Sequence, residues 1–152
     1  MHPTLDPSFY YLANFHKALA WLTDHHGDLL AADERVFVTT FQNQPVASQA
    51  LLVRLIMRKG PHFRLSKLHY PEIGCSATAA APLIAAGWLN TQAPLEIETL
   101  CKLLRKEELL ATFAEQLATP RASKAQAQTL LAEHYSEPRP FADWCPNANE
   151  QV

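Results

Sequence analysis

The sequence predicts a mainly α-helical protein with one short β element. Apolar side chains recur at steps of three and four residues over long stretches, and residues that start or stop helices flank these stretches. The chain has 152 residues, of which 48% are hydrophobic, which is enough to bury a core. It contains no apolar run of the roughly 20 residues that cross a bilayer. A folded helical protein with no membrane partner is therefore expected.

The first half of the chain predicts three helices, at about residues 8–26, 32–43 and 48–59. Ser8 can cap the free N–H groups of the first helix, and Gly27 can end it, because glycine enters the left-handed region without penalty. The second helix must end before Pro45. The third is apolar on most of its circumference, which places it at the centre of the core.

The second half predicts a short bent strand at residues 62–70 and helices at 76–86, 95–117 and 124–135, the helix at 95–117 being broken near Arg105. Phe63 and Leu65 alternate with polar residues, which is typical of a strand. Pro94 divides the chain into domains at 8–93 and 95–135, and the proline-rich, polar residues 136–152 are expected to be a truncated linker. The residues expected to share one core are Leu12, Phe15, Leu51, Leu55, Ile56, Leu83 and Trp88.

The middle of the chain carries charge of one sign. No Asp or Glu occurs between Arg35 and Pro71. The basic residues of this stretch, called the basic window below, are Arg35, Arg54, Arg58, Lys59, Arg64 and Lys67. Such a stretch creates a local positive field that attracts phosphate, which indicates a nucleic-acid partner. The alternatives are a solvated basic face or ion pairs with Asp28, Asp33 or Glu72.

Two further features bear on binding. Arg54 and Arg58 stand four residues apart on one helix stripe and repel by a few tenths of a kcal/mol, so a compensating group from outside the helix is expected. Arg121 and Lys124 flank a helix start, where unpaired N–H groups attract anions, and they are candidate phosphate contacts. Their alternative is an ordinary charged loop.

Several other kinds of site find no support. The three cysteines are odd in number and widely spaced, which predicts no disulfide framework and favours the cytoplasm. No CxxC occurs, and His25 and His26 are adjacent rather than at ligand spacing, so no metal site is expected. The N-terminus lacks the basic start and apolar stretch of a secretory signal.

Four segments of the chain resemble the N-terminal region of the Fanconi-associated nucleases, in particular bacterial members. These segments are YYLANF at 10–15, SQALLVRLIMRKG at 48–60, FRLSKLHYPEIG at 63–74 and GWL at 87–89. The resemblance implies a winged-helix-like N-terminal domain followed by a SAP-like helix–loop–helix. The residues that match the SAP pattern are Leu103, Leu104, Glu108, Leu109, Lys124, Leu130 and Leu131.

The resemblance also implies a function. Members of this family are structure-specific DNA repair nucleases with phosphodiesterase activity on flapped and crosslinked DNA, carried by a C-terminal VRR-type nuclease domain. That domain needs Mg²⁺ or Mn²⁺ held by a Glu…Asp…Glu-x-Lys cluster. The acidic pairs here, Asp33–Glu34 and Glu107–Glu108, are interpreted as solvated helix positions. The chain is therefore expected to lack catalytic residues and to need no cofactor of its own.

The sequence thus predicts the N-terminal fragment of a repair nuclease. It is expected to bind flap or branched DNA through the phosphate backbone and to meet the C-terminal domains of the parent protein. The predicted DNA-binding residues are Arg54, Arg58, Lys59, Arg64, Lys67, Arg121 and Lys124. The alternative is a protein–protein or interdomain interaction module with a basic face.

Overall fold

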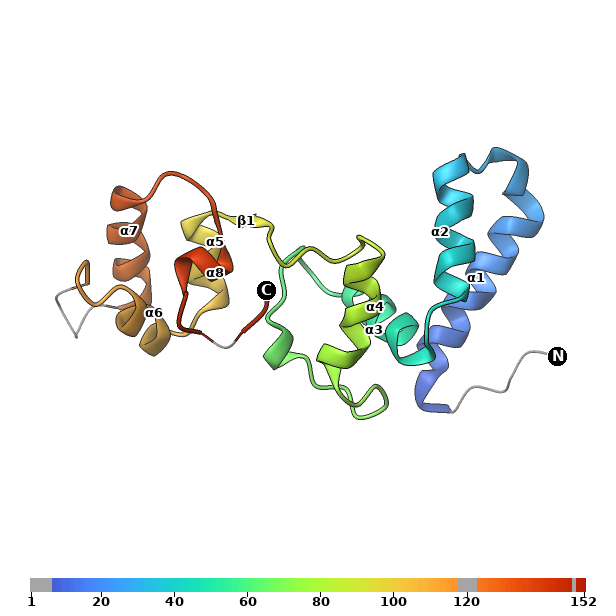
Figure 1. Ribbon diagram of the computed structural model, residues 1–152, viewed down its shortest axis with the longest axis horizontal. Coiled ribbons are helices and arrows are strands. Elements are labelled where there is room, and N and C mark those ends of the chain that lie inside the picture. The colour runs from blue at the N-terminus through green and yellow to red at the C-terminus, as the bar shows by residue number, and fades with distance from the viewer. Residues whose placement is uncertain (1–6, 118–122, 149) are drawn as a thin grey trace. The chain divides into compact units, whose positions relative to one another are not determined.

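The computed structural model describes residues 7–117, 123–148 and 150–152. They are mainly helical, as predicted, and form two compact units (Figure 1). The first unit comprises the chain up to Pro61 together with Leu68–Leu89, and the second comprises His62–Lys67 and Asn90–Val152. The basic window is therefore divided between two folding units.

The first unit is built from four α-helices and two short 3-10 helices. Its elements are η1 (Pro7–Phe9), α1 (Tyr10–His26), η2 (Gly27–Leu29), α2 (Ala32–Gln42), α3 (Val46–Ile56) and α4 (Ser76–Ala85). As predicted, α3 is central: it packs against both α1 and α4. Trp88 lies half-buried against Phe37, with 4.8 Å between ring centroids.

The predicted core is confirmed in part. Leu12, Leu51, Leu55 and Leu83 are buried, and Phe15 and Trp88 are half-buried. The prediction is wrong for Ile56, whose side chain is 58% exposed. Ile56 is the last residue of α3, which ends there and not at Lys59. Its direction differs by about 100° from that of the buried Leu55 before it, so it turns away from the packed face.

A three-residue turn, Asn43 to Pro45, joins α2 to α3 and makes a helix–turn–helix. Gln49 holds this turn from the inside. Its Nε2 donates to the carbonyl oxygens of Gln42 at 3.2 Å and Gln44 at 2.8 Å, and its Oε1 lies 2.7 Å from His16 Nε2. Gln49 is only 5% exposed, so a buried amide with all these partners specifies the geometry of the turn.

The second unit contains the only paired strands among the described residues. Its elements are η3 (Leu65–Lys67), β1 (Pro94–Leu95), α5 (Ile97–Leu103), α6 (Lys106–Thr112), α7 (Lys124–His134), β2 (Arg139–Pro140) and α8 (Phe141–Trp144). β1 and β2 pair antiparallel, with Pro94 opposite Pro140 and Leu95 opposite Arg139. The long helix predicted at 95–117 is broken near Arg105, as expected, because Leu104 and Arg105 are both extended.

The strand predicted at residues 62–70 is wrong. That segment instead forms the 3-10 turn η3, in which Lys67 N donates to Arg64 O at 3.0 Å. The physical reason is that the Arg64 side chain is bonded within the second unit and holds the segment as a turn. The short β element of the fold therefore lies at β1 and β2 and not beside α3.

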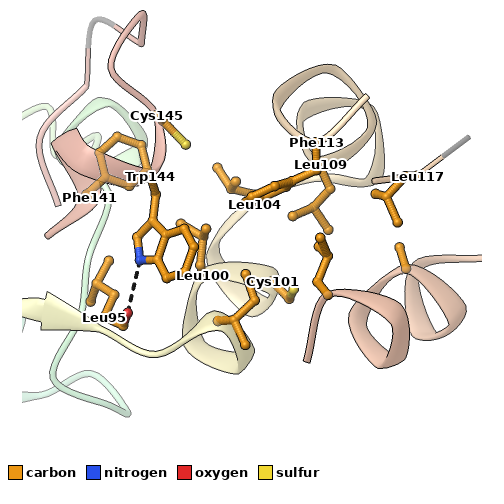
Figure 2. Packing of buried hydrophobic residues seen from close by; sticks show 13 residues of the cluster. Leu95, Leu100, Cys101, Leu104, Leu109, Phe113, Leu117, Phe141, Trp144 and Cys145 are labelled. Carbon is orange, nitrogen blue, oxygen red and sulfur yellow. Dashed lines mark hydrogen bonds between the residues drawn. The ribbon is translucent and has the colours of Figure 1, made fainter. Parts of the chain in front are cut away.

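The linker predicted at residues 136–152 is also wrong, because this segment completes the second core. Phe141, Trp144 and Cys145 are only 3–7% exposed. Figure 2 shows Trp144 with its indole Nε1 donating to the carbonyl oxygen of Leu95 at 3.0 Å. The other labelled residues of this core are Leu100, Cys101, Leu104, Leu109, Phe113 and Leu117. The prolines that suggested a linker border the short helix α8, with Pro140 at its N-cap.

Among the residues described, no helix has the length and apolar character needed to span a membrane. All three cysteines are free thiols, with Cys101 and Cys145 buried and Cys75 exposed.

Candidate nucleic-acid interface

Arg54, on α3, is held by side chains from two other segments of the first unit, α1 and residues 70–72. Its Nη2 and Nε donate to Glu72 Oε1 at 2.7 and 3.1 Å. Tyr11 OH donates to the same oxygen at 2.9 Å. The guanidinium also lies over the Tyr11 ring, 4.1 Å from its centroid, and 5.0 Å from that of Tyr70. The alternative expectation of an ion pair with Glu72 is confirmed for Arg54.

This cluster shifts the proton affinities of its members. Burial raises the pKa of Tyr11 to about 12, and the hydrogen bond to Glu72 acts in the same direction. Burial would raise the pKa of Glu72, but the hydrogen bonds from Arg54 and Tyr11 outweigh it and lower that pKa. The Glu72 side chain is 8% exposed and that of Arg54 is 30% exposed. Glu72 is thus an ionised, nearly buried carboxylate whose charge Arg54 compensates.

Arg58 and Lys59 follow the end of α3 and are exposed. Arg58 Nη1 donates to the Tyr70 hydroxyl at 3.1 Å, so the two arginines four residues apart contact the same tyrosine, Arg54 at its ring and Arg58 at its hydroxyl. The expected compensation from outside the helix comes from Glu72, which binds Arg54. Arg58 and Lys59 are thus the exposed cations that follow α3, whereas the charge of Arg54 is compensated by Glu72.

Arg64 belongs to the second unit and is bound there on several sides. Its Nη1 and Nη2 donate to the two carboxylate oxygens of Glu108 at 2.8 and 2.9 Å, and its Nε donates to Glu150 at 3.2 Å. Nη1 also donates to the carbonyl oxygen of Leu103 at 3.2 Å. The Arg64 side chain is only 11% exposed. Its charge is therefore used to hold the second unit together.

The two carboxylates that bind Arg64 have roles that the sequence does not predict. Glu108, expected to be a solvated helix position, forms this ion pair and also accepts the Arg105 N–H at 2.7 Å at the start of α6. The hydrogen bonds from Arg64 lower the pKa of Glu108 to about 2. Glu150 lies in the segment expected to be a linker. Burial would raise its pKa, but hydrogen bonds from Ser66 and Arg64 outweigh burial and lower it.

The remaining predicted binding residues lie apart from these two clusters. Lys67, at the end of η3, is exposed, and its side chain forms no ion pair with any described residue. Lys124 is the first residue of α7, half-buried, beside the capping box that Ser123 and Gln126 form. Arg121 lies outside the described residues. Of the six predicted binding residues that the structure describes, Arg54 and Arg64 form internal ion pairs.

Nuclease chemistry of the implied kind needs a metal-binding cluster, and the described residues do not supply one. No three His, Cys, Asp or Glu side chains in this part of the chain lie together as metal ligands. The acidic groups that do meet, Glu108 and Glu150, are both bound by Arg64. These residues do not fit Mg²⁺ or Mn²⁺.

A helix–turn–helix unit followed by a second small helical unit, with exposed cations on both, is an architecture of DNA-binding proteins. The family model for the FAN1 HTH domain matches residues 9–90, and that for the Fanconi anemia-associated nuclease SAP domain matches residues 94–144. The chain belongs to the Fanconi-associated nuclease 1 family.

Relatives and solved structures agree. The chain is 43% identical over 150 residues to the Fanconi-associated nuclease 1 homolog of Pseudomonas aeruginosa, covering 99% of this chain and 27% of that relative. It is 34% identical over 124 residues to human Fanconi-associated nuclease 1, covering 77% of this chain and 12% of the human protein. A crystal structure of paFAN1 bound to 2nt 5′ flap DNA with gap matches with a TM-score of 0.90 and 42% identity over 98% of this chain and 27% of that one. The chain thus spans about a quarter of the length of the bacterial relative.

Proposed function

We propose that this chain is the DNA-binding N-terminal part of a structure-specific repair nuclease, which positions flap or branched DNA for a nuclease domain outside these residues. One observation carries the proposal. The chain follows the fold of paFAN1, a protein crystallised with 5′ flap DNA, at a TM-score of 0.90 over 98% of its length with 42% identity. Such similarity supports a shared way of binding DNA.

The phosphate backbone is the part of DNA that these residues suit. Arg58 offers a planar guanidinium that can bind one phosphate through two N–H groups at once. Lys59, Lys67 and Lys124 act as point charges. Cations that bind phosphates position the duplex without reading its sequence. Binding should therefore depend strongly on salt and weakly on base sequence. Arg121 remains a further predicted contact of the same kind.

The test is a titration of 5′ flap DNA with the whole chain at several salt concentrations. Arg58→Ala should raise Kd similarly for unrelated DNA sequences and should lower the slope of log K against log salt by about 1. Lys17→Ala, which removes the same charge from an exposed position on α1, is the matched control and should leave the slope unchanged. Sequence-selective loss would indicate base readout instead.

Two results would contradict the proposal. The first is that unlabelled duplex and flap DNA fail to displace labelled flap DNA from the chain, which would mean that the chain has no general DNA-binding site. If Arg58→Ala and Lys59→Ala both leave affinity and slope unchanged, the basic end of α3 meets another protein or another domain, which is the alternative function.

We also expect no cleavage of flap DNA by residues 1–152 in Mg²⁺ or Mn²⁺, since the described residues hold no ligand cluster for such a metal. The metal is expected to serve a nuclease domain elsewhere in the parent protein. The measurement is a gel assay of labelled flap DNA incubated with the purified chain. Metal-dependent cleavage that persists through a further chromatographic step and is abolished by a point change in the chain would contradict this expectation.

A further inference from the structure

We propose that Glu108 and Glu150, two acidic residues, act as positioning residues that hold Lys67 for contact with a DNA phosphate. This inference rests on the proposed function and assigns one of its contacts. It is unexpected from charge alone, because a carboxylate near a DNA-binding surface repels phosphate. Residues 64–67, called the η3 segment below, lie in the second unit.

The η3 segment is fixed at each residue that precedes Lys67. The Arg64 side chain binds Glu108 and Glu150, and Leu65 N donates to Gln151 O at 2.9 Å. Ser66 N donates to Glu150 Oε1 at 3.0 Å, and the Ser66 hydroxyl donates to the other oxygen of the same carboxylate. The turn closes with Lys67 N donating to Arg64 O. The backbone of Lys67 is thereby held while its side chain remains exposed.

Arg64 itself is poorly suited to bind a phosphate. A guanidinium has five N–H donors. Arg64 already makes four hydrogen bonds, to Glu108, Glu150 and Leu103. Its charge is compensated twice over by two carboxylates. Lys67 is the next cation along the chain, and no described acidic residue pairs with it. The exposed cation of this segment is therefore Lys67.

Holding Lys67 in place can favour DNA binding by more than the repulsion between Glu150 and the phosphate disfavours it. A lysine on a mobile loop loses backbone and side-chain freedom when it binds, and this loss weakens the contact. When the loop is held in advance, only the side chain has to be ordered. Glu150 binds three groups of the η3 segment, and Arg64, which also binds Glu108, offsets part of its charge. Its removal should therefore cost more in loop order than it gains in reduced repulsion.

The direction in which Glu150→Gln changes DNA affinity tests this inference. Glu150→Gln makes the chain more positive, so general electrostatics predicts tighter DNA binding, whereas positioning predicts weaker binding. With 5′ flap DNA as the probe, we expect Glu150→Gln to raise Kd by roughly threefold, approaching the effect of losing one phosphate contact. The matched control Glu137→Gln removes the same charge from an exposed residue of the second unit and should leave Kd unchanged or lower it.

Two further variants make the assignment specific. Ser66→Ala removes one hydrogen bond to Glu150 without changing charge and should also raise Kd. In the Lys67→Ala background, which lowers the salt slope by about 1, Glu150→Gln should have no further effect. Thermal melting of each variant identifies loss of fold. Should Glu150→Gln melt early, the comparison is made with Ser66→Ala and its double variant with Lys67→Ala.

The inference is overturned if Glu150→Gln and Ser66→Ala bind DNA as tightly as the parent chain or more tightly. It is also overturned if Glu150→Gln weakens binding equally with and without Lys67. Failure of the proposed function would give a different result: the unmodified chain would show no binding of flap DNA that unlabelled DNA displaces. If Arg58→Ala weakens binding and Lys67→Ala does not, the function stands and this inference fails.

Discussion

Arg54→Ala should destabilise the first unit, and the structure allows the size of the effect to be worked out. The change leaves Glu72, whose side chain is 8% exposed, with Tyr11 as its remaining side-chain donor. Breaking a buried ion pair costs about 3–5 kcal/mol, whereas an exposed pair contributes about 0–1. Because Arg54 is 30% exposed, we expect an intermediate loss of about 2 kcal/mol. For a domain of this size that lowers Tm by about 10 °C.

The assay is thermal or urea unfolding followed by circular dichroism, with DNA affinity measured on the same samples below the transition. Lys17→Ala is the control, since removing an exposed charge on α1 should change stability by less than about 0.5 kcal/mol. Adding Glu72→Gln to Arg54→Ala should recover part of the loss, because the uncompensated carboxylate is then gone. If Arg54→Ala weakens DNA binding while the melting curve and the double variant show no change, Arg54 contacts phosphate directly and this reasoning is refuted.

Two other predictions concern the second unit. Trp144→Ala should destabilise it by about 3–5 kcal/mol, since the change empties a large buried site and leaves the Leu95 carbonyl without its partner, and an unchanged unfolding curve would mean that this segment is peripheral. Ionised Glu108 should stabilise this unit fully above about pH 4.3, its ordinary pKa, and lose that contribution as the pH falls through its folded value of about 2. Acid unfolding of Glu108→Gln should accordingly show a weaker pH dependence between these values, and an identical dependence would contradict the assignment.

The sequence predicts the helices well because their signals are local. The spacing of Leu12, Phe15 and Leu19 is sufficient to indicate α1, and Pro45 limits α2 whatever the rest of the chain does. The boundary that failed, the end of α3, depends on where α1 and α4 stop covering it. That is a tertiary property, and Met57 and Ile56 are as apolar as the buried residues before them.

The two larger errors share a different cause, the pairing of residues far apart in the chain. The η3 segment alternates like a strand, but Arg64 meets carboxylates 44 and 86 residues away, and these bonds decide its shape. The residues after Ser136 are rich in proline and polar side chains, yet Trp144 completes a core begun at Leu95, 49 residues earlier. No local pattern signals such partners. Only an acidic residue or an aromatic in an otherwise linker-like stretch gives a hint.

The same contrast applies to the basic window, whose absence of acidic residues is a property of the sequence and not of a surface. Folding brings Glu72 to Arg54, and it brings Glu108 and Glu150 to Arg64. The charges of these two arginines are therefore compensated within the protein. Arg58, Lys59 and Lys67, which stand beside them in sequence, keep exposed side chains. Each of these exposed cations follows an ion-paired arginine by three to five residues. The pattern suits phosphate binding. A cation whose backbone is already held loses less conformational freedom when it binds a phosphate, and this adds to the attraction between the opposite charges.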